Sequence, residues 1–153
     1  MYLQNDESWN HFREISRLIE TSEECILCTC WIDEEAINSL EPFISRRSSP
    51  KVIKIFSDGS LRHVPKKIRE QLRCNSRVQH FFATRGSRLH SKIYYFSTND
   101  TYVAIIGSAN LTGRGLLRND EFSKVVSGSK ESSEHRELIE YLTGIEATLK
   151  PNT

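Results

Sequence analysis

The residues best suited to chemistry in this chain gather between positions 89 and 122. His90 and Lys92 are separated by one residue, and side chains two apart on an extended strand point to the same face, about 7 Å from each other. An imidazole can act as a nucleophile, and a lysine ammonium supplies a fixed positive charge. The spacing therefore predicts a nucleophile and a cation on one side of a strand.

A polar turn follows the apolar residues 102 to 106. In Gly107-Ser108-Ala109-Asn110 the glycine lets the backbone approach a ligand closely, and the serine and asparagine offer short polar side chains. A short helix starting there would add backbone N–H groups for an anion. Glu121 opens the next predicted strand, where a carboxylate can hold an imidazole in the required tautomer.

Together these residues resemble the signature of the phospholipase D superfamily, His-x-Lys followed by a Gly-Ser-x-Asn turn. The matching segments are His90-Ser91-Lys92 and Gly107-Ser108-Ala109-Asn110. Asn119-Asp120-Glu121 is similar to the Asn-x-Glu ending of the family's nucleases, particularly its small single-motif nucleases and metal-independent restriction endonucleases. Many members carry an aspartate five residues after the lysine, where this chain has Ser97, but nuclease relatives commonly use the later glutamate instead.

The resemblance implies a phosphodiesterase that needs neither a metal ion nor a cofactor. His90 would attack the phosphorus and form a covalent phosphohistidine. Lys92 and Asn110 would hold the non-bridging oxygens, together with the Ser108 hydroxyl. Glu121 would orient the nucleophilic ring. A second histidine must protonate the leaving oxygen. Because only one His-x-Lys motif is present, the simplest arrangement is a homodimer with one composite active site on its two-fold axis.

The surrounding pattern predicts an α/β fold. Strand and helix alternate first and successive strands follow, which indicates a mixed β-sheet, and the resemblance implies a phospholipase D-like sheet flanked by helices on both faces. No repeat, linker or low-complexity tract is seen, so residues 1–153 are expected to form a single nuclease domain. We expect helices at about 7–22, from Ala36 to before Pro50, from Pro65 to Arg73 and at 131–149, and strands at 24–31, 51–57, 77–83, 89–97, 102–107 and 121–127.

Positive charge is concentrated in the middle of the chain. The net charge is only +1, but residues 46–92 hold thirteen lysines and arginines against two acids, whereas residues 1–45 hold two bases against ten acids. Such a basic segment is typical of a surface that neutralises a phosphate backbone, and a solvated face balanced by the acidic first third is the alternative. The basic residues are Arg46, Arg47, Lys51, Lys54, Arg62, Lys66, Lys67, Arg69, Arg73, Arg77, Arg85, Arg88 and Lys92.

The cysteines and the amino terminus favour a cytoplasmic location. No stretch reaches the roughly 18 apolar residues of a membrane span, and the start lacks the build of a secretory signal. Three of the four cysteines crowd residues 25 to 30, which predicts reduced thiols. Cys25-x-x-Cys28 has the spacing of a zinc half-site, but no second pair completes it. Hydrogen-bonded or packed roles are expected for His11, His63, His80 and His135.

Metal-dependent nucleases form the competing enzyme class, and the sequence disfavours them. Their compact pattern places a lysine two residues after a carboxylate that helps to bind magnesium. Here the residue two positions after Glu70 is Leu72, and the residue two positions after Glu121 is Ser123, so neither carboxylate has the lysine.

The predicted function is therefore metal-independent cleavage of DNA, and a restriction or other defence system is the setting that we expect for it. Little chain remains for sequence recognition, which would come from a fused domain, from a partner subunit, or not at all. A catalytically silent nucleic-acid-binding module of the same fold is the non-enzymatic alternative. RNA and phospholipid are the alternative substrates, although the sequence shows no apolar helix that would face a membrane.

Overall fold

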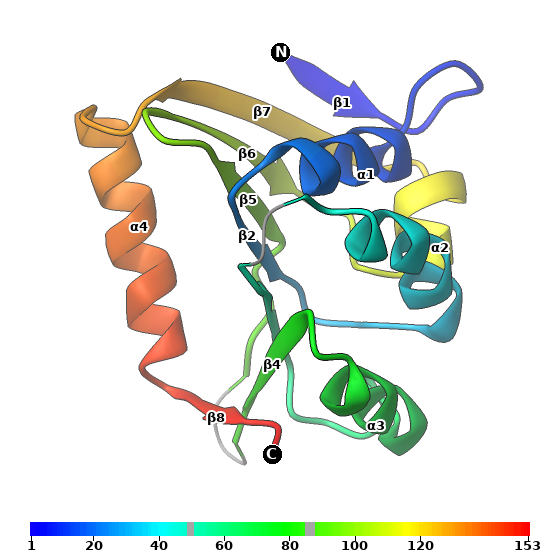
Figure 1. The fold of residues 1–153 in the computed structure, drawn as a ribbon. Helices are drawn as coiled ribbons and strands as arrows, with labels where there is room; N and C mark the ends of the chain where they lie inside the picture. Colours follow the sequence, from blue (N-terminus) through cyan, green and yellow to red (C-terminus); the bar gives the residue numbers. More distant parts are fainter. Residues whose placement is uncertain (49–50, 85–87) are drawn as a thin grey trace.

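The computed structural model describes residues 1–48, 51–84 and 88–153, which form an eight-stranded sheet with helices on both faces (Figure 1). The strand order is β1-β7-β6-β5-β2-β3-β4-β8. In chain order the elements are β1 (Tyr2–Gln4), α1 (His11–Thr21), β2 (Glu24–Cys28), α2 (Glu34–Ser45), β3 (Ile53–Ser57), α3 (Lys66–Cys74), β4 (Val78–Ala83), β5 (Ile93–Ser97), β6 (Thr101–Gly107), the π-helical turn η1 (Arg114–Arg118), β7 (Phe122–Ser129), α4 (Ser133–Glu146) and β8 (Leu149–Pro151).

The strand directions confirm the predicted mixed sheet. Helices α2 and α3 connect β2, β3 and β4, which run parallel. Strands β5, β6 and β7 are antiparallel; a short connection joins β5 to β6, and a longer one that contains η1 joins β6 to β7. Because β5 also runs antiparallel to β2, its first residue Ile93 pairs with Cys28 at the end of β2. The end of β6 and the start of β7 meet at the same edge, where Gly107 pairs with Ser123. The end of β2, the start of β5, the end of β6 and the start of β7 therefore lie along one edge of the sheet, here called the convergent edge.

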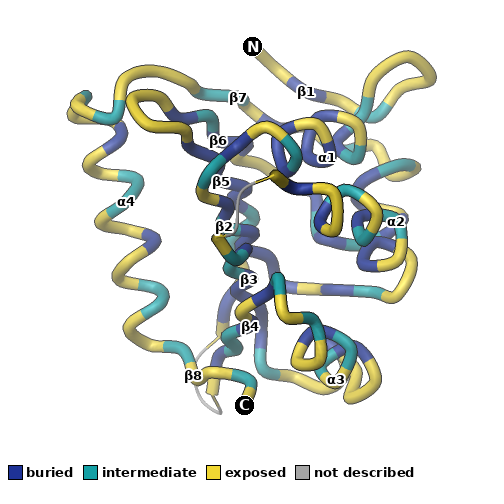
Figure 2. Tube along the Cα trace, in the orientation of Figure 1, coloured by how far each residue is buried: buried dark blue, intermediate teal, exposed yellow. Residues whose placement is uncertain are grey.

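Helices cover both faces of the sheet, as expected. Helices α1, α2 and α3 lie on one face and α4 lies on the other (Figure 1). The first face buries residues such as Ile15, Leu40 and Ile55, and the second buries Tyr95 and Leu142. Double coverage explains the nearly unbroken apolar runs of the central strands, whose traces are mostly buried in Figure 2.

The first helix is shorter than the predicted 7–22, for a local reason. Asp6 accepts hydrogen bonds from the backbone N–H groups of Ser8 and Trp9, which makes a turn of these residues. Asn10 then caps α1 by accepting from the N–H of Arg13. The helix consequently begins at His11.

The predicted helix 131–149 is also too long, and the two outermost strands were not predicted. Helix α4 ends at Glu146, and the chain then turns so that β8 pairs with β4. Both β8 and β1 have three residues, too few to show an alternating pattern. None of the helices in the described part of the chain combines the length and apolar character that a bilayer span requires.

Candidate active site

His90 and Lys92 lie in the segment that leads into β5. The prediction that they belong to a strand is wrong, since β5 begins at Ile93. The segment is nevertheless fixed: the N–H of Gly107 donates to the Lys92 carbonyl at 3.2 Å, and the Ser91 and Tyr141 hydroxyls are 2.6 Å apart. These contacts hold His90 at an exposed position on the convergent edge of the sheet.

The two motif side chains contact each other, as the same-side prediction required. The Lys92 Nζ lies 3.2 Å from both ring nitrogens of His90. Each ring nitrogen forms its best hydrogen bond in the ring plane, pointing away from the other nitrogen. An ammonium equidistant from both is therefore aligned with neither. Among the described residues it is the only hydrogen-bonding contact of the ring, so the in-plane directions are open to a substrate.

Gly107 allows β6 and β7 to close tightly beside this pair. A Cβ at this position would lie 2.1 Å from the Ser123 Oγ and 2.5 Å from the Phe122 carbonyl oxygen. Only glycine avoids that overlap. The predicted turn therefore exists, but no helix starts within it; the nearest helical turn begins at Arg114.

Glu121 and Ser108 form a hydrogen-bonded pair beside the turn. The Ser108 hydroxyl donates to one Glu121 carboxylate oxygen, and the Asn119 amide donates to the other at 3.3 Å. The Phe122 N–H donates to the Ser108 Oγ at 3.2 Å. Within the described chain, no hydrogen bond joins Glu121 to His90. The carboxylate instead positions Ser108 at the mouth of the site.

Asn110 is oriented from the end of β2. Its Oδ1 accepts from the Trp31 N–H at 3.2 Å and from the Thr29 hydroxyl at 3.3 Å. Gly115 packs so closely against the Asn110 backbone that a Cβ there would lie 2.4 Å from its carbonyl oxygen. Since the amide oxygen is engaged, the Nδ2 is the group that can donate to an anion.

Ser97, which stands where many family members carry an aspartate, is remote from the motif. It is buried at the opposite end of β5 from His90 and pairs with Tyr102. Five residues of extended chain separate it from Lys92, about 16 Å. The departure from the family pattern therefore leaves the chemistry of the convergent edge intact.

His90 borders two pockets. One, of about 550 Å³, is also lined by Lys92, Ser108 and Tyr141. The other, of about 740 Å³, is also lined by Cys30, Asp58 and His63, and by two arginines. The two pockets leave open space around the exposed His90 ring.

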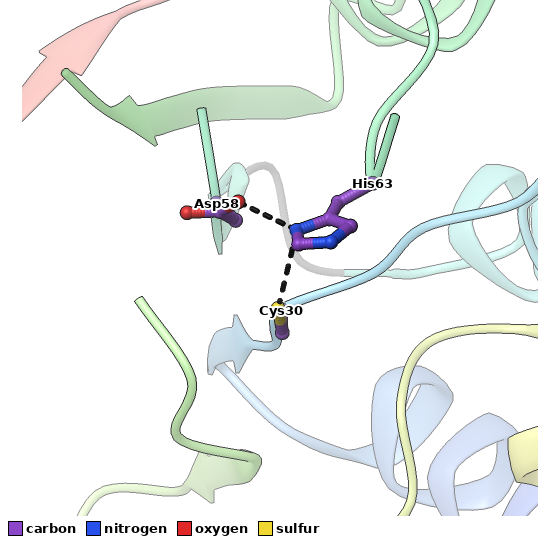
Figure 3. A group of neighbouring side chains, drawn as sticks. All are labelled: Cys30, Asp58 and His63. Carbon is purple, nitrogen blue, oxygen red and sulfur yellow. Dashed lines mark hydrogen bonds and ion pairs between the residues drawn. The ribbon is translucent and has the colours of Figure 1, made fainter. Parts of the chain in front are cut away.

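The lining of the larger pocket includes a cluster of side chains that the sequence did not reveal. The His63 Nδ1 lies 2.6 Å from the Asp58 Oδ2 and 3.7 Å from the Cys30 Sγ (Figure 3). Burial raises the pKa of the Asp58 carboxyl, but hydrogen bonds, first of all from His63, lower it overall. Burial, reinforced by Asp58, raises the pKa of the Cys30 thiol. The sequence held one signal for this cluster: Cys30 and Asp58 lie at the ends of two predicted strands that a helix joins, and residues in such positions gather at the carboxyl edge of a sheet.

The remaining histidines are hydrogen-bonded, as predicted. Both His11 ring nitrogens have partners at 2.8 Å, Asn5 and Ser123. The His80 Nε2 lies 2.7 Å from the Ser57 hydroxyl, and His135 contacts the Tyr95 hydroxyl at 2.8 Å. Burial lowers the pKa of His11, and it lowers that of His80 to about 4. The rings of His11, His80 and His135 therefore have structural roles.

The basic residues that the structure describes in the middle of the chain do not form one free phosphate-binding surface. Arg47 is buried and donates to the carbonyls of Ser22 and Glu23, and other basic groups are paired with carboxylates. Arg62 and Arg88 line the larger pocket, while Arg85 lies outside the described residues. The ion pairs are Arg46–Glu20, Lys54–Glu146, Lys67–Glu34 and Arg73–Glu70.

All four cysteines are free thiols, as predicted. Cys25 and Cys28 pack into the cores on opposite faces of the sheet, so their spacing does not make a zinc half-site. Burial raises the pKa of both thiols to about 12.

Comparison with solved structures shows the same fold in several other proteins. The phospholipase D family member Nuc from Salmonella typhimurium has a TM-score of 0.70 at 14% identity, covering 99% of this chain and 95% of that one. NucT from Helicobacter pylori has a TM-score of 0.68 at 11% identity, covering 92% and 90%. Yeast tyrosyl-DNA phosphodiesterase is similar over 95% of this chain and 37% of its own, with a TM-score of 0.59 at 14% identity.

A search of curated protein sequences finds no match. The family described as "Cardiolipin synthase, PLD-like domain" matches residues 15–143, which include every strand from β2 to β7 and both motif segments. This match covers most of the sequence, and the fold agrees with it; the chain therefore belongs to the phospholipase D-like family.

Proposed function

We propose that residues 1–153 form a single nuclease domain that hydrolyses phosphodiester bonds in DNA without a metal ion. The observation that carries the proposal is the exposed His90 ring, which the Lys92 ammonium contacts at 3.2 Å without occupying the in-plane direction of either nitrogen. A nucleophile needs that open direction, and a phosphate needs the cation beside it.

In the first step a His90 ring nitrogen attacks the phosphorus. An N–P bond forms, the bond to the leaving oxygen breaks, and that oxygen takes a proton from a second imidazolium. Lys92 and the Asn110 Nδ2 stabilise the charge on the non-bridging oxygens, with Ser108 placed by Glu121 at the same mouth. In the second step water attacks the phosphorus, gives its proton to the second imidazole, and releases His90.

A homodimer supplies the second imidazole from another copy of His90. Exposed apolar side chains border the convergent edge: Tyr2 and Phe122 stack at 4.9 Å, and Ile106 and Tyr141 line the pocket that holds His90. Large exposed apolar groups around a site are typical of an interaction surface. Two copies related by a two-fold axis would cover these groups and bring both motif histidines together.

DNA as the substrate is supported by Arg62 and Arg88 in the pocket beside His90. One of the similar structures supports the same substrate, since it is a tyrosyl-DNA phosphodiesterase. Cleavage within a cytoplasmic restriction or defence system fits a small catalytic domain whose sequence recognition comes from a fused domain or a partner subunit.

The decisive experiment is incubation with circular and linear, single- and double-stranded DNA and RNA, and with phospholipid vesicles, all in EDTA. We expect DNA cleavage by the native protein and none by His90→Ala. Cleavage that EDTA stops and magnesium restores would overturn the mechanism. Binding without cleavage would identify a silent nucleic-acid-binding module, and turnover of RNA or phospholipid alone would reassign the substrate.

A further inference from the structure

Cys30, Asp58 and His63 are brought together by three separate parts of the chain. Cys30 lies two residues after β2, Asp58 directly follows β3, and His63 lies in the loop before α3. Backbone hydrogen bonds tie these parts to one another: the Asp58 N–H donates to the Cys30 carbonyl at 3.3 Å, and the Ile32 N–H donates to the His63 carbonyl at 3.1 Å. The positions of the three side chains are therefore set by the sheet and its loops.

The three side chains turn their ligand atoms toward one point. A thiol sulfur, a carboxylate oxygen and an imidazole nitrogen all lie within 4.8 Å of one another (Figure 3). From these atoms we propose that Cys30, Asp58 and His63 form a zinc site on the wall of the pocket that leads to His90. Three protein ligands leave the fourth tetrahedral position for water or a phosphate oxygen.

The two separations measured from the His63 nitrogen are close to those that tetrahedral zinc needs. Zn–N, Zn–O and Zn–S bonds of ordinary length place a nitrogen about 3.4 Å from the oxygen and about 3.6 Å from the sulfur. The His63 Nδ1 is 3.7 Å from the Cys30 Sγ and 2.6 Å from the Asp58 Oδ2. The sulfur is thus already at the right distance, and the carboxylate must withdraw by less than about 1 Å.

The donor set selects the metal. A thiolate and an imidazole favour zinc over magnesium, which prefers oxygen ligands in a full octahedron. On binding, Cys30 loses its thiol proton to solvent, and the His63 proton moves from Nδ1 to Nε2, so that Nδ1 can donate its lone pair. The thiolate and the Asp58 carboxylate then carry two negative charges that offset the ion. The other Asp58 oxygen accepts from the Leu89 N–H at 3.4 Å and fixes the carboxylate.

Zinc in this position would inhibit the nuclease. The ion would sit in the pocket that His90, Arg62 and Arg88 also line, and its open position would capture phosphate away from the nucleophile. This consequence rests on the proposed function, whereas zinc binding itself does not.

The test is calorimetric titration of the metal-free native protein with zinc alone. We expect one ion per chain, and a loss of affinity exceeding about 100-fold in both Cys30→Ser and His63→Ala, more than the loss of an outer partner causes. Cys74→Ser is the matched control, because Cys74 is an exposed thiol elsewhere, and it should bind zinc normally. His90→Ala should also bind, and magnesium should not compete.

Cobalt provides a second readout that does not depend on activity. Native protein, but not Cys30→Ser, should show thiolate-to-cobalt charge-transfer absorption, and circular dichroism shows whether each variant is folded. Zinc affinity unchanged in folded Cys30→Ser or His63→Ala would overturn the site. If zinc binds as expected but the chain cleaves no nucleic acid, the proposed function fails and the metal site stands.

Discussion

His90 and His63 line the same pocket but are held in opposite ways. His90 is exposed, and among the described residues its ring has a hydrogen-bonding contact with Lys92 alone. His63 is half-buried, packs on Trp31 with ring centroids 4.4 Å apart, and is paired with Asp58. An open ring can attack a substrate, and a tied ring can hold an ion in a fixed place. Identical side chains thus become suited to different tasks through what surrounds them.

The largest effect should come from replacing each of the two histidines by alanine in separate variants. His90→Ala should lower the rate of DNA cleavage by about 10⁴-fold or more, because it removes the nucleophile. His63→Ala, measured in EDTA, should stay within about tenfold of the native rate, since His63 contacts no group in the proposed reaction. An equal loss of cleavage rate in both variants would identify His63 as the group that protonates the leaving oxygen within the same chain. The two histidines would then both be catalytic.

His80 is a third kind of histidine, because it is buried and therefore affects stability rather than the reaction. Its pKa is lowered from 6.5 to about 4 by burial, so the unfolded chain binds a proton at a higher pH than the folded one. Its contribution to stability is complete above pH 6.5 and is lost as the pH falls toward 4, by about 3 kcal/mol. Urea unfolding across this range should show a flatter pH profile for His80→Gln than for the native protein. Parallel profiles would contradict this assignment.

Random mixing of native and His90→Ala chains tests whether the open ring acts alone. After joint unfolding and refolding in equal amounts, about a quarter of the dimers carry two native chains. A composite site requires both copies, so activity per total chain should fall to about a quarter. Independent sites would leave about half. A value near half, with chain exchange confirmed by differently tagged subunits, would reject the shared site while keeping His90 as the nucleophile.

The smallest effect concerns the arginines that line the same pocket as His90. Arg88→Glu should lower the slope of log affinity against log salt by at least about 0.7 to 0.9, the value for one lost phosphate contact. Lys67→Glu is the control, because Lys67 is already paired with Glu34 at 2.8 Å and should change the slope less. Equal slopes for Arg88→Glu and the native protein would place the nucleic acid elsewhere.

The sequence predicted the central strands and the order of the elements, because their apolar periodicity is strong. It also brought His90, Lys92 and the Gly107 turn to one place, because they are joined by short connections. The edge strands β1 and β8 were missed, since three residues carry no pattern. The Cys30, Asp58 and His63 cluster was missed for a different reason: residues up to 33 positions apart meet only through the parallel packing of β2 and β3.

The convergence of chain ends on one sheet edge has a consequence for how this protein can change. One continuous stretch, residues 90–121, supplies the attacking and phosphate-binding groups, while the loops after β2 and β3 help to line the larger pocket beside His90. Those loops can be shortened, lengthened or exchanged without altering the motif, provided that Thr29 and Trp31 still hold Asn110. Changes in these loops can thus give new substrate selectivity or a binding site for a new effector, while the residues of the motif keep the same reaction.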